Sequence, residues 1–121
     1  MLRFWRATLN SRNGLVFAMR SEQAIREELV ALALAMPVSW LAGATMMRRV
    51  ELVAAVVLVL IVELLNTAIE KLSDRLTTDH DPQIGRVKDM GSAAVMLSFA
   101  MLGTVWLLIL SDHGHPHTFS P

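Results

Sequence analysis

Four polar side chains follow a long apolar run, residues 52–62, at helical spacing. They are Glu63, Asn66, Glu70 and Asp74, and on a helix that turns about 100° per residue they share one narrow face. Glu63 directly follows the apolar run, so it is expected at membrane depth, where a charged side chain normally faces protein or a water-filled site. Glu70 lies about 10 Å further along the helix axis. The two carboxylates are therefore expected to have different roles.

Other polar groups are expected near the same depth. Glu22 and Glu28 begin the first apolar segment, and Lys88 and Asp89 begin the third. Phosphoryl transfer needs a carboxylate-bound Mg²⁺, a cation on the phosphates and a base for the attacking hydroxyl. The interfacial carboxylates, Lys88 and the deeper Glu63 could supply these parts. The chain has no Walker A sequence and no kinase glycine-rich loop, so spacing alone leaves a proton or cation pathway equally open.

The composition favours one small membrane domain, residues 1–121. The chain is 54% hydrophobic, which is too apolar for an ordinary soluble domain. Its formal net charge is zero, so nothing in the charge balance favours binding to nucleic acid. Because the chain has no cysteine, disulfides, thiolate metal sites and cysteine nucleophiles are excluded.

Three apolar segments predict an all-α membrane protein with three transmembrane helices. A hydrocarbon core about 30 Å thick needs roughly 20 helical residues. The spans are expected at about residues 24–46, 50–76 and 87–111. Residues 76–86, LTTDHDPQIGR, contain Pro and Gly and are expected to form the connecting loop. Residues 112–121 are expected to form a polar, disordered tail.

The basic residues predict the orientation, because lysine and arginine are enriched on the cytoplasmic side of short loops. Five arginines precede the uncharged part of the first span, which begins at Leu29, and four basic residues flank the second loop, whereas Arg48 and Arg49 lie on the other side. The N-terminus is therefore expected to be cytoplasmic and the C-terminus periplasmic. Residues 3–20 have the pattern of an amphipathic helix on the membrane surface.

Two motifs, VELLNTAIEKLSDR at residues 62–75 and GRVKDMGSAA at residues 85–94, carry a family resemblance. The sequence resembles the prokaryotic membrane diacylglycerol kinase family over nearly the whole chain. The resemblance implies a homotrimeric bundle in the bacterial inner membrane, with sites shared between subunits. It also implies transfer of the γ-phosphate of MgATP to diacylglycerol, giving phosphatidic acid. Undecaprenol is the alternative acceptor lipid, and a small proton-coupled transporter or channel is the alternative from another class.

The resemblance implies roles for single residues. Glu63 matches the first glutamate of an E-x-x-N-x-x-x-E motif, which is the expected general base. Glu22 and Glu70 match two carboxylates that are expected to bind Mg²⁺. The residues that match the nucleotide site are Arg3, Ser11, Glu22, Asn66, Glu70, Asp74, Lys88 and Asp89.

Purely structural interpretations compete with some of these assignments. Glu63 could form a hydrogen bond that only packs helices. Gly91, Ala94 and Ser98 follow helical spacing on the third span and are expected to be close-packing positions. Trp106, like the other two tryptophans, is expected to be an anchor at the membrane interface.

Overall fold

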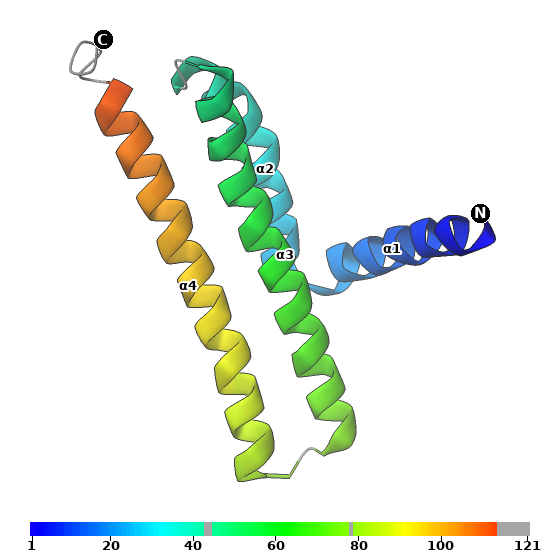
Figure 1. Ribbon diagram of the computed structural model, residues 1–121. Helices are drawn as coiled ribbons and strands as arrows, with labels where there is room; N and C mark the ends of the chain where they lie inside the picture. Colours follow the sequence, from blue (N-terminus) through cyan, green and yellow to red (C-terminus); the bar gives the residue numbers. More distant parts are fainter. Residues whose placement is uncertain (43–44, 78, 114–121) are drawn as a thin grey trace.

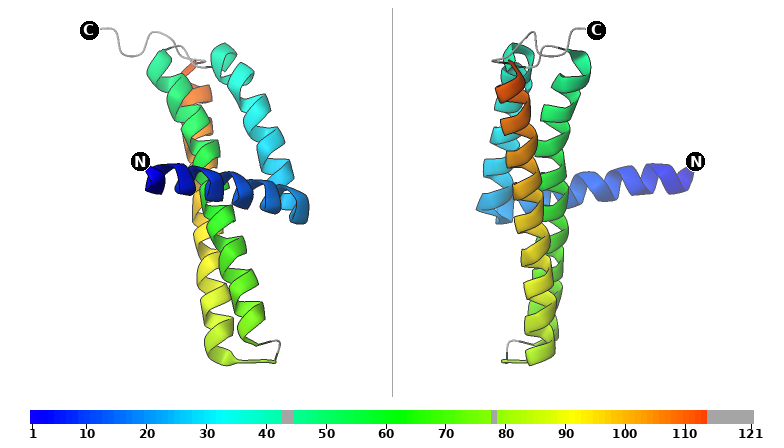
Figure 2. Two further views of the ribbon diagram at one scale, coloured as in Figure 1. Left: turned by 90° about the vertical axis from the view of Figure 1, so that its right-hand side faces the viewer. Right: turned by 60° about the vertical axis from the view of Figure 1, so that its left-hand side comes forward.

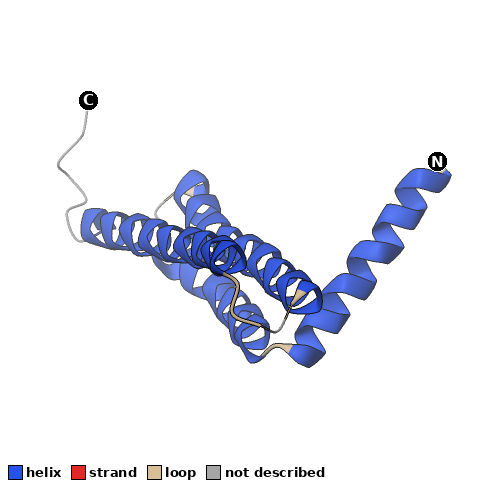
Figure 3. Cartoon of the chain, turned by 90° about the horizontal axis from the view of Figure 1, so that it is seen from below, coloured by secondary structure: helices blue, strands red, loops and turns tan. Residues whose placement is uncertain are grey.

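The computed structural model describes residues 1–42, 45–77 and 79–113. Its elements are α1 (Leu2–Ser21), α2 (Gln23–Ala42), α3 (Met46–Leu76) and α4 (Pro82–His113). The last three form a bundle, and α1 leaves it at mid-height, where α2 begins (Figure 1). α1 also projects from the bundle in the right-hand view of Figure 2 and when seen from below (Figure 3). The predicted all-α architecture is confirmed.

Two of the helices are long and apolar enough to cross a membrane, α3 with 31 residues and α4 with 32. These helices correspond to the second and third predicted spans. The described part of α2 has 20 residues, and its first two turns contain Arg26, Glu27 and Glu28. Because of these charges, α2 does not meet the same test, and the first predicted span stays a prediction.

α4 begins earlier than the sequence suggested. Asp81 Oδ1 accepts hydrogen bonds from the backbone N–H groups of Gln83 at 2.9 Å and Ile84 at 3.4 Å. Pro82 occupies the first helical position, where its missing N–H costs nothing. The prediction that residues 76–86 form a loop was therefore wrong from Pro82 onward.

Helices form the two ends of the described chain, α1 at the N-terminus and α4 at the C-terminus. α1 confirms a helix over residues 3–20, although its place on a membrane surface stays a prediction. α4 continues to His113, so the first residues of the predicted tail, 112 and 113, are helical. The rest of that tail, residues 114–121, lies outside the described residues.

Buried apolar side chains gather in two clusters. The first joins α1, α2 and α3 through Ala18, Ile25 and Leu60. The second lies at the opposite end of α2 and joins α2, α3 and α4 through Ala42, Leu52 and Ile109. The first cluster fixes the level at which α1 meets α3, about one turn before Glu63.

Trp106 ties α4 to α3 beside the second cluster. Its indole Nε1 donates a hydrogen bond to the backbone oxygen of Leu52 at 3.1 Å. Arg48 and Asp112 form an ion pair between the same two helices closer to the end of the bundle. Trp106 thus has a packing role, and its predicted position at a membrane interface is not tested by these contacts.

We expect Trp106→Phe to lower the stability of the bundle. Phenylalanine keeps an aromatic ring but has no N–H to donate, and one hydrogen bond contributes about 1 kcal/mol. Thermal unfolding in detergent, followed by circular dichroism, should therefore begin at a lower temperature. Trp5→Phe is the matched control, because Trp5 is exposed on α1. Equal shifts in both variants would contradict a packing role for Trp106.

Candidate active site

α3 carries the predicted polar face as one continuous helix. Asn66 Nδ2 donates a hydrogen bond to Glu70 Oε1 at 3.2 Å, one turn further along. Side chains four residues apart on a helix are neighbours, so this contact follows directly from the spacing. Asn66 is buried and Glu70 is exposed. The amide therefore holds a carboxylate at the boundary between the bundle interior and the open side.

Gly91 of α4 lies directly against Asn66. A methyl group on Gly91 would overlap Asn66 Oδ1, so only a residue without a side chain allows α4 this close to α3. Asn66 Oδ1 is buried and accepts no hydrogen bond from any described residue. Such an oxygen is costly unless another group donates to it or coordinates it. The close packing of Gly91 covers this oxygen and leaves it unpaired.

Glu28 of α2 reaches Glu63 of α3. Their carboxyl groups lie within hydrogen-bonding reach of each other. The Glu28 oxygen Oε2 is buried and has no partner among the described residues. Two carboxyl groups in contact share a proton more readily than they carry two charges. The pair therefore places Glu28, which can hold a proton, beside Glu63, which can accept one.

Lys88 of α4 contacts the far end of the polar face. Its Nζ lies 2.5 Å from Asp74 Oδ1. The two side chains are 39% and 63% exposed, so the ion pair contributes little to stability. Its effect is on position, because it brings an ammonium group to the α3 face that carries Glu70 and Asn66.

Glu22 lies at the junction of α1 and α2 and also contacts α3. Its Oε1 is 3.0 Å from Nζ of Lys71, the residue that follows Glu70. The same ammonium lies 5.2 Å from the centre of the Phe17 ring. The structure thus brings Glu22 to the part of α3 that carries Glu70, and the shared metal site stays a prediction.

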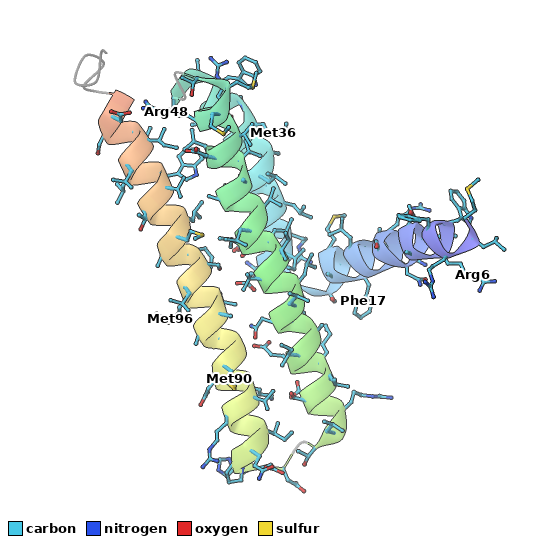
Figure 4. The ribbon with its side chains drawn as sticks, in the orientation of Figure 1. Arg6, Phe17, Met36, Arg48, Met90 and Met96 are labelled. Atoms are coloured by element: carbon cyan, nitrogen blue, oxygen red, sulfur yellow. The ribbon has the colours of Figure 1, made fainter. Side chains whose placement is uncertain are left out.

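α1 holds the remaining predicted residues. Ser11 lines a cavity of about 620 Å³ together with Phe17, Thr67 and Lys71, and its Oγ donates to the Ala7 oxygen at 2.8 Å. Figure 4 shows Phe17 near the bundle and Arg6 towards the far end of α1. Arg3 lies still closer to that far end, so a single chain does not bring Arg3 to the polar face of α3.

Asp89, next to Lys88 on α4, is exposed and forms no hydrogen bond or ion pair within residues 1–42, 45–77 and 79–113. No contact within one chain supports its predicted role in a nucleotide site, and that role stays a prediction.

The oxygen donors of this region suit a hard divalent cation such as Mg²⁺. Among the described residues, no three acidic or histidine side chains converge to form a metal cluster. Mg²⁺ rarely needs such a cluster, because it commonly takes one or two carboxylates and completes its shell with water and substrate phosphates. Glu22 and Glu70 offer two carboxylates near one part of α3. These are donors of the kind that Mg²⁺ takes when a nucleotide supplies the other ligands.

The sequence did not assign a role to Lys71, although a cation inside a motif rich in carboxylates was a usable signal. Gly91 and Ser98 are buried, so their predicted packing roles are confirmed. Ala94 is exposed in the single chain, so its predicted packing role stays a prediction. Gly91 and Ser98 are separated by two helical turns and face α3 together, whereas Ala94 lies to one side of that face.

The chain is similar to known proteins over most of its length. Residues 9–110 match the profile of a family described as prokaryotic diacylglycerol kinase. A diacylglycerol kinase of Escherichia coli strain K12 is 40% identical over 103 residues, which cover 85% of this chain and 84% of that protein. A diacylglycerol kinase of Pseudomonas aeruginosa is 36% identical over 108 residues, 89% and 88% of the two chains. That of Haemophilus influenzae is 35% identical over 100 residues, 83% and 85% of the two chains.

Two glycine substitutions on α4 should shift stability in opposite directions. Gly91→Ala should lower the unfolding temperature, because forcing a methyl group against Asn66 costs about 1–3 kcal/mol. Gly103→Ala should raise it, because that position opens to free space and alanine stabilises a helix by about 0.5–1 kcal/mol. Thermal unfolding of both variants in the same detergent compares them directly. A rise for Gly91→Ala would show that α4 does not approach Asn66 so closely.

Proposed function

The chain belongs to the prokaryotic diacylglycerol kinase family, and we propose that it transfers the γ-phosphate of ATP to the free hydroxyl of diacylglycerol. The products are phosphatidic acid and ADP. The observation that carries this proposal is the contact between Glu28 and Glu63 at the end of the long apolar run of α3. A lipid hydroxyl that approaches from within the membrane would meet a proton acceptor there.

Glu63 acts as the general base. It takes the proton from the lipid hydroxyl while the hydroxyl oxygen forms a bond to the γ-phosphorus. The bond between that phosphorus and the oxygen that bridges to the β-phosphate breaks, and ADP leaves with that oxygen. Glu28 supports this role by holding the proton that the two carboxyl groups share, so that Glu63 is free to accept another.

The outer part of the polar face serves the nucleotide. When bound, Mg²⁺ would neutralise charge on the phosphate oxygens. Glu22 and Glu70 would hold the ion, and Asn66 fixes Glu70 through their hydrogen bond. Lys88, kept on this face by Asp74, supplies a positive charge for phosphate during transfer. The base Glu63 and the metal ligand Glu70 are thus about 10 Å apart along the axis of one helix.

The arrangement in the membrane is part of the proposal. α2 forms a third span, the N-terminus is cytoplasmic, the C-terminus is periplasmic, and the protein lies in the inner membrane. The excess of basic residues before the first span and around the second loop supports this orientation. The extent of the three spans, about residues 24–46, 50–76 and 87–111, stays as predicted from the sequence.

The protein works as a homotrimer with sites shared between subunits. α1 projects from its own bundle, which leaves Arg3 and the outer part of α1 available to a neighbouring copy (Figure 1). Large apolar side chains are also exposed along the bundle, where lipid or another subunit can cover them. Examples are Leu34, Leu41, Leu107 and Leu108.

One assay tests the activity and its acceptor. Purified protein in mixed micelles should transfer radiolabelled phosphate from ATP to diacylglycerol in the presence of Mg²⁺. A parallel reaction contains undecaprenol in place of diacylglycerol. Label on undecaprenol alone would show that the acceptor is wrong, and no labelled lipid in either reaction would contradict the kinase activity itself.

Glu63→Gln should remove the base while keeping the shape of the side chain. General-base catalysis contributes about 10²- to 10⁴-fold, so lipid phosphorylation should fall by about that factor. Nucleotide binding, measured by calorimetry, should be largely retained. Glu63→Asp should keep a small remainder, because its carboxylate is withdrawn by one methylene.

Glu51→Gln is the matched control, since Glu51 is exposed near the opposite end of α3. It should phosphorylate lipid at the wild-type rate. If Glu63→Gln also does so, Glu63 has only a structural role in packing α2 against α3.

A further inference from the structure

We propose that Lys71 is a built-in counter-ion of Glu22 that competes with the divalent cation for this carboxylate. Lys71 would thereby set the metal concentration at which the site fills. The inference rests on the proposed function, because it takes Glu22 as a metal ligand. It concerns a residue to which neither the motif nor its spacing gave a role.

The ammonium of Lys71 is held from two sides. Glu22 Oε1 lies 3.0 Å from Nζ, and the Phe17 ring centre lies 5.2 Å from it. The side chains of Lys71 and Glu22 are 43% and 34% exposed. The pair is thus partly shielded from water, and each charge is screened less than at a fully exposed position.

A metal and an ammonium group cannot share Glu22 without cost. When a cation binds, the Glu22 carboxylate oxygen that accepts a hydrogen bond from Lys71 has to give up this hydrogen bond, or its negative charge is divided between the ammonium group and the cation. The remaining ammonium would then repel a divalent ion held beside it by Glu22 and Glu70. Removing the charge of Lys71 should therefore tighten metal binding.

Two other roles for Lys71 predict different results. If Lys71 were a phosphate contact, its loss would weaken nucleotide binding and slow catalysis. Its ammonium, however, points towards Glu22 and Phe17 at the α1 junction, and the cation beside Asp74 is Lys88. If Lys71 only fastened α1 to α3, its loss would reduce stability and leave metal affinity unchanged.

The test measures metal binding directly. The full chain in detergent micelles is titrated with Mn²⁺ in the presence of a non-hydrolysable ATP analogue, which supplies the phosphate ligands, and free Mn²⁺ is followed by electron paramagnetic resonance. A titration of the analogue alone is subtracted. Lys71→Met, which keeps much of the apolar stem but removes the charge, should bind Mn²⁺ about fivefold more tightly, a factor at the upper end of what partly exposed ion pairs contribute. Lys71→Arg, which keeps the charge, should bind within about twofold of the wild type.

Arg75→Met provides the matched control for the net charge of α3. Arg75 lies one turn beyond Lys71, and no ion pair of Arg75 is found among the described residues. It should leave Mn²⁺ affinity within about twofold of the wild type. In lipid phosphorylation, Lys71→Met should also need about fivefold less Mg²⁺ for half-maximal rate, with the rate at saturating Mg²⁺ retained.

Unchanged or weaker Mn²⁺ binding by folded Lys71→Met would overturn the proposal, and so would equal tightening by Arg75→Met. Circular dichroism establishes folding, and Lys71→Gln serves in the same comparison if the methionine variant does not fold. The proposed function fails separately, if wild-type protein neither binds Mn²⁺ nor phosphorylates a lipid. If the wild type does both and neutral variants at position 71 bind Mn²⁺ equally, only the counter-ion role is wrong.

Discussion

The contact of Gly91 with Asn66 sets the register between α3 and α4. Because no side chain separates the two helices there, α4 can approach until it touches the Asn66 amide. This contact determines which residues of α4 meet α3 on either side of Gly91. Lys88 then meets Asp74 towards one end of the pair, and Trp106 meets Leu52 towards the other. A shift of α4 by one residue would turn its contact face by about 100° and break these contacts together. The polar face of α3 therefore depends on a position that has no side chain of its own.

This register matters because the polar groups lie beside a long apolar run, where water offers few hydrogen bonds. Buried polar side chains in such surroundings have to find partners within the protein. Glu63 meets Glu28 from α2, and Asn66 binds Glu70 on its own helix. The Asn66 oxygen has no such partner among the described residues, because it lies buried against Gly91. The close approach of α4 to α3 therefore leaves one polar group unpaired.

Features within one helix were accessible from the sequence, because the helical repeat fixes which residues share a face. The alignment of Glu63 with Asn66 is an example, and the structure retains it. The sequence does not reveal the start of α4, because a proline commonly indicates a loop, although after Asp81 it is a favourable first helical residue. The contact of Glu28 with Glu63 was beyond the sequence, because it depends on how α2 packs against α3. The direction of α1, which takes Arg3 away from the polar face, is a tertiary property of the same kind.

The junction of α1 and α2 couples metal binding by Glu22 to the contact between α1 and α3. Glu22 would bind metal there, and the partner of Glu22 in this structure, Lys71, also contacts Phe17 of α1. Thermodynamic coupling between two sites is reciprocal. If a cation displaces Lys71 from Glu22, the contact between α3 and the end of α1 changes. Conversely, a movement of α1 that changes this contact changes the free energy of metal binding by the same amount. A helix that rests on the membrane surface would in this way make metal binding sensitive to the lipid around it.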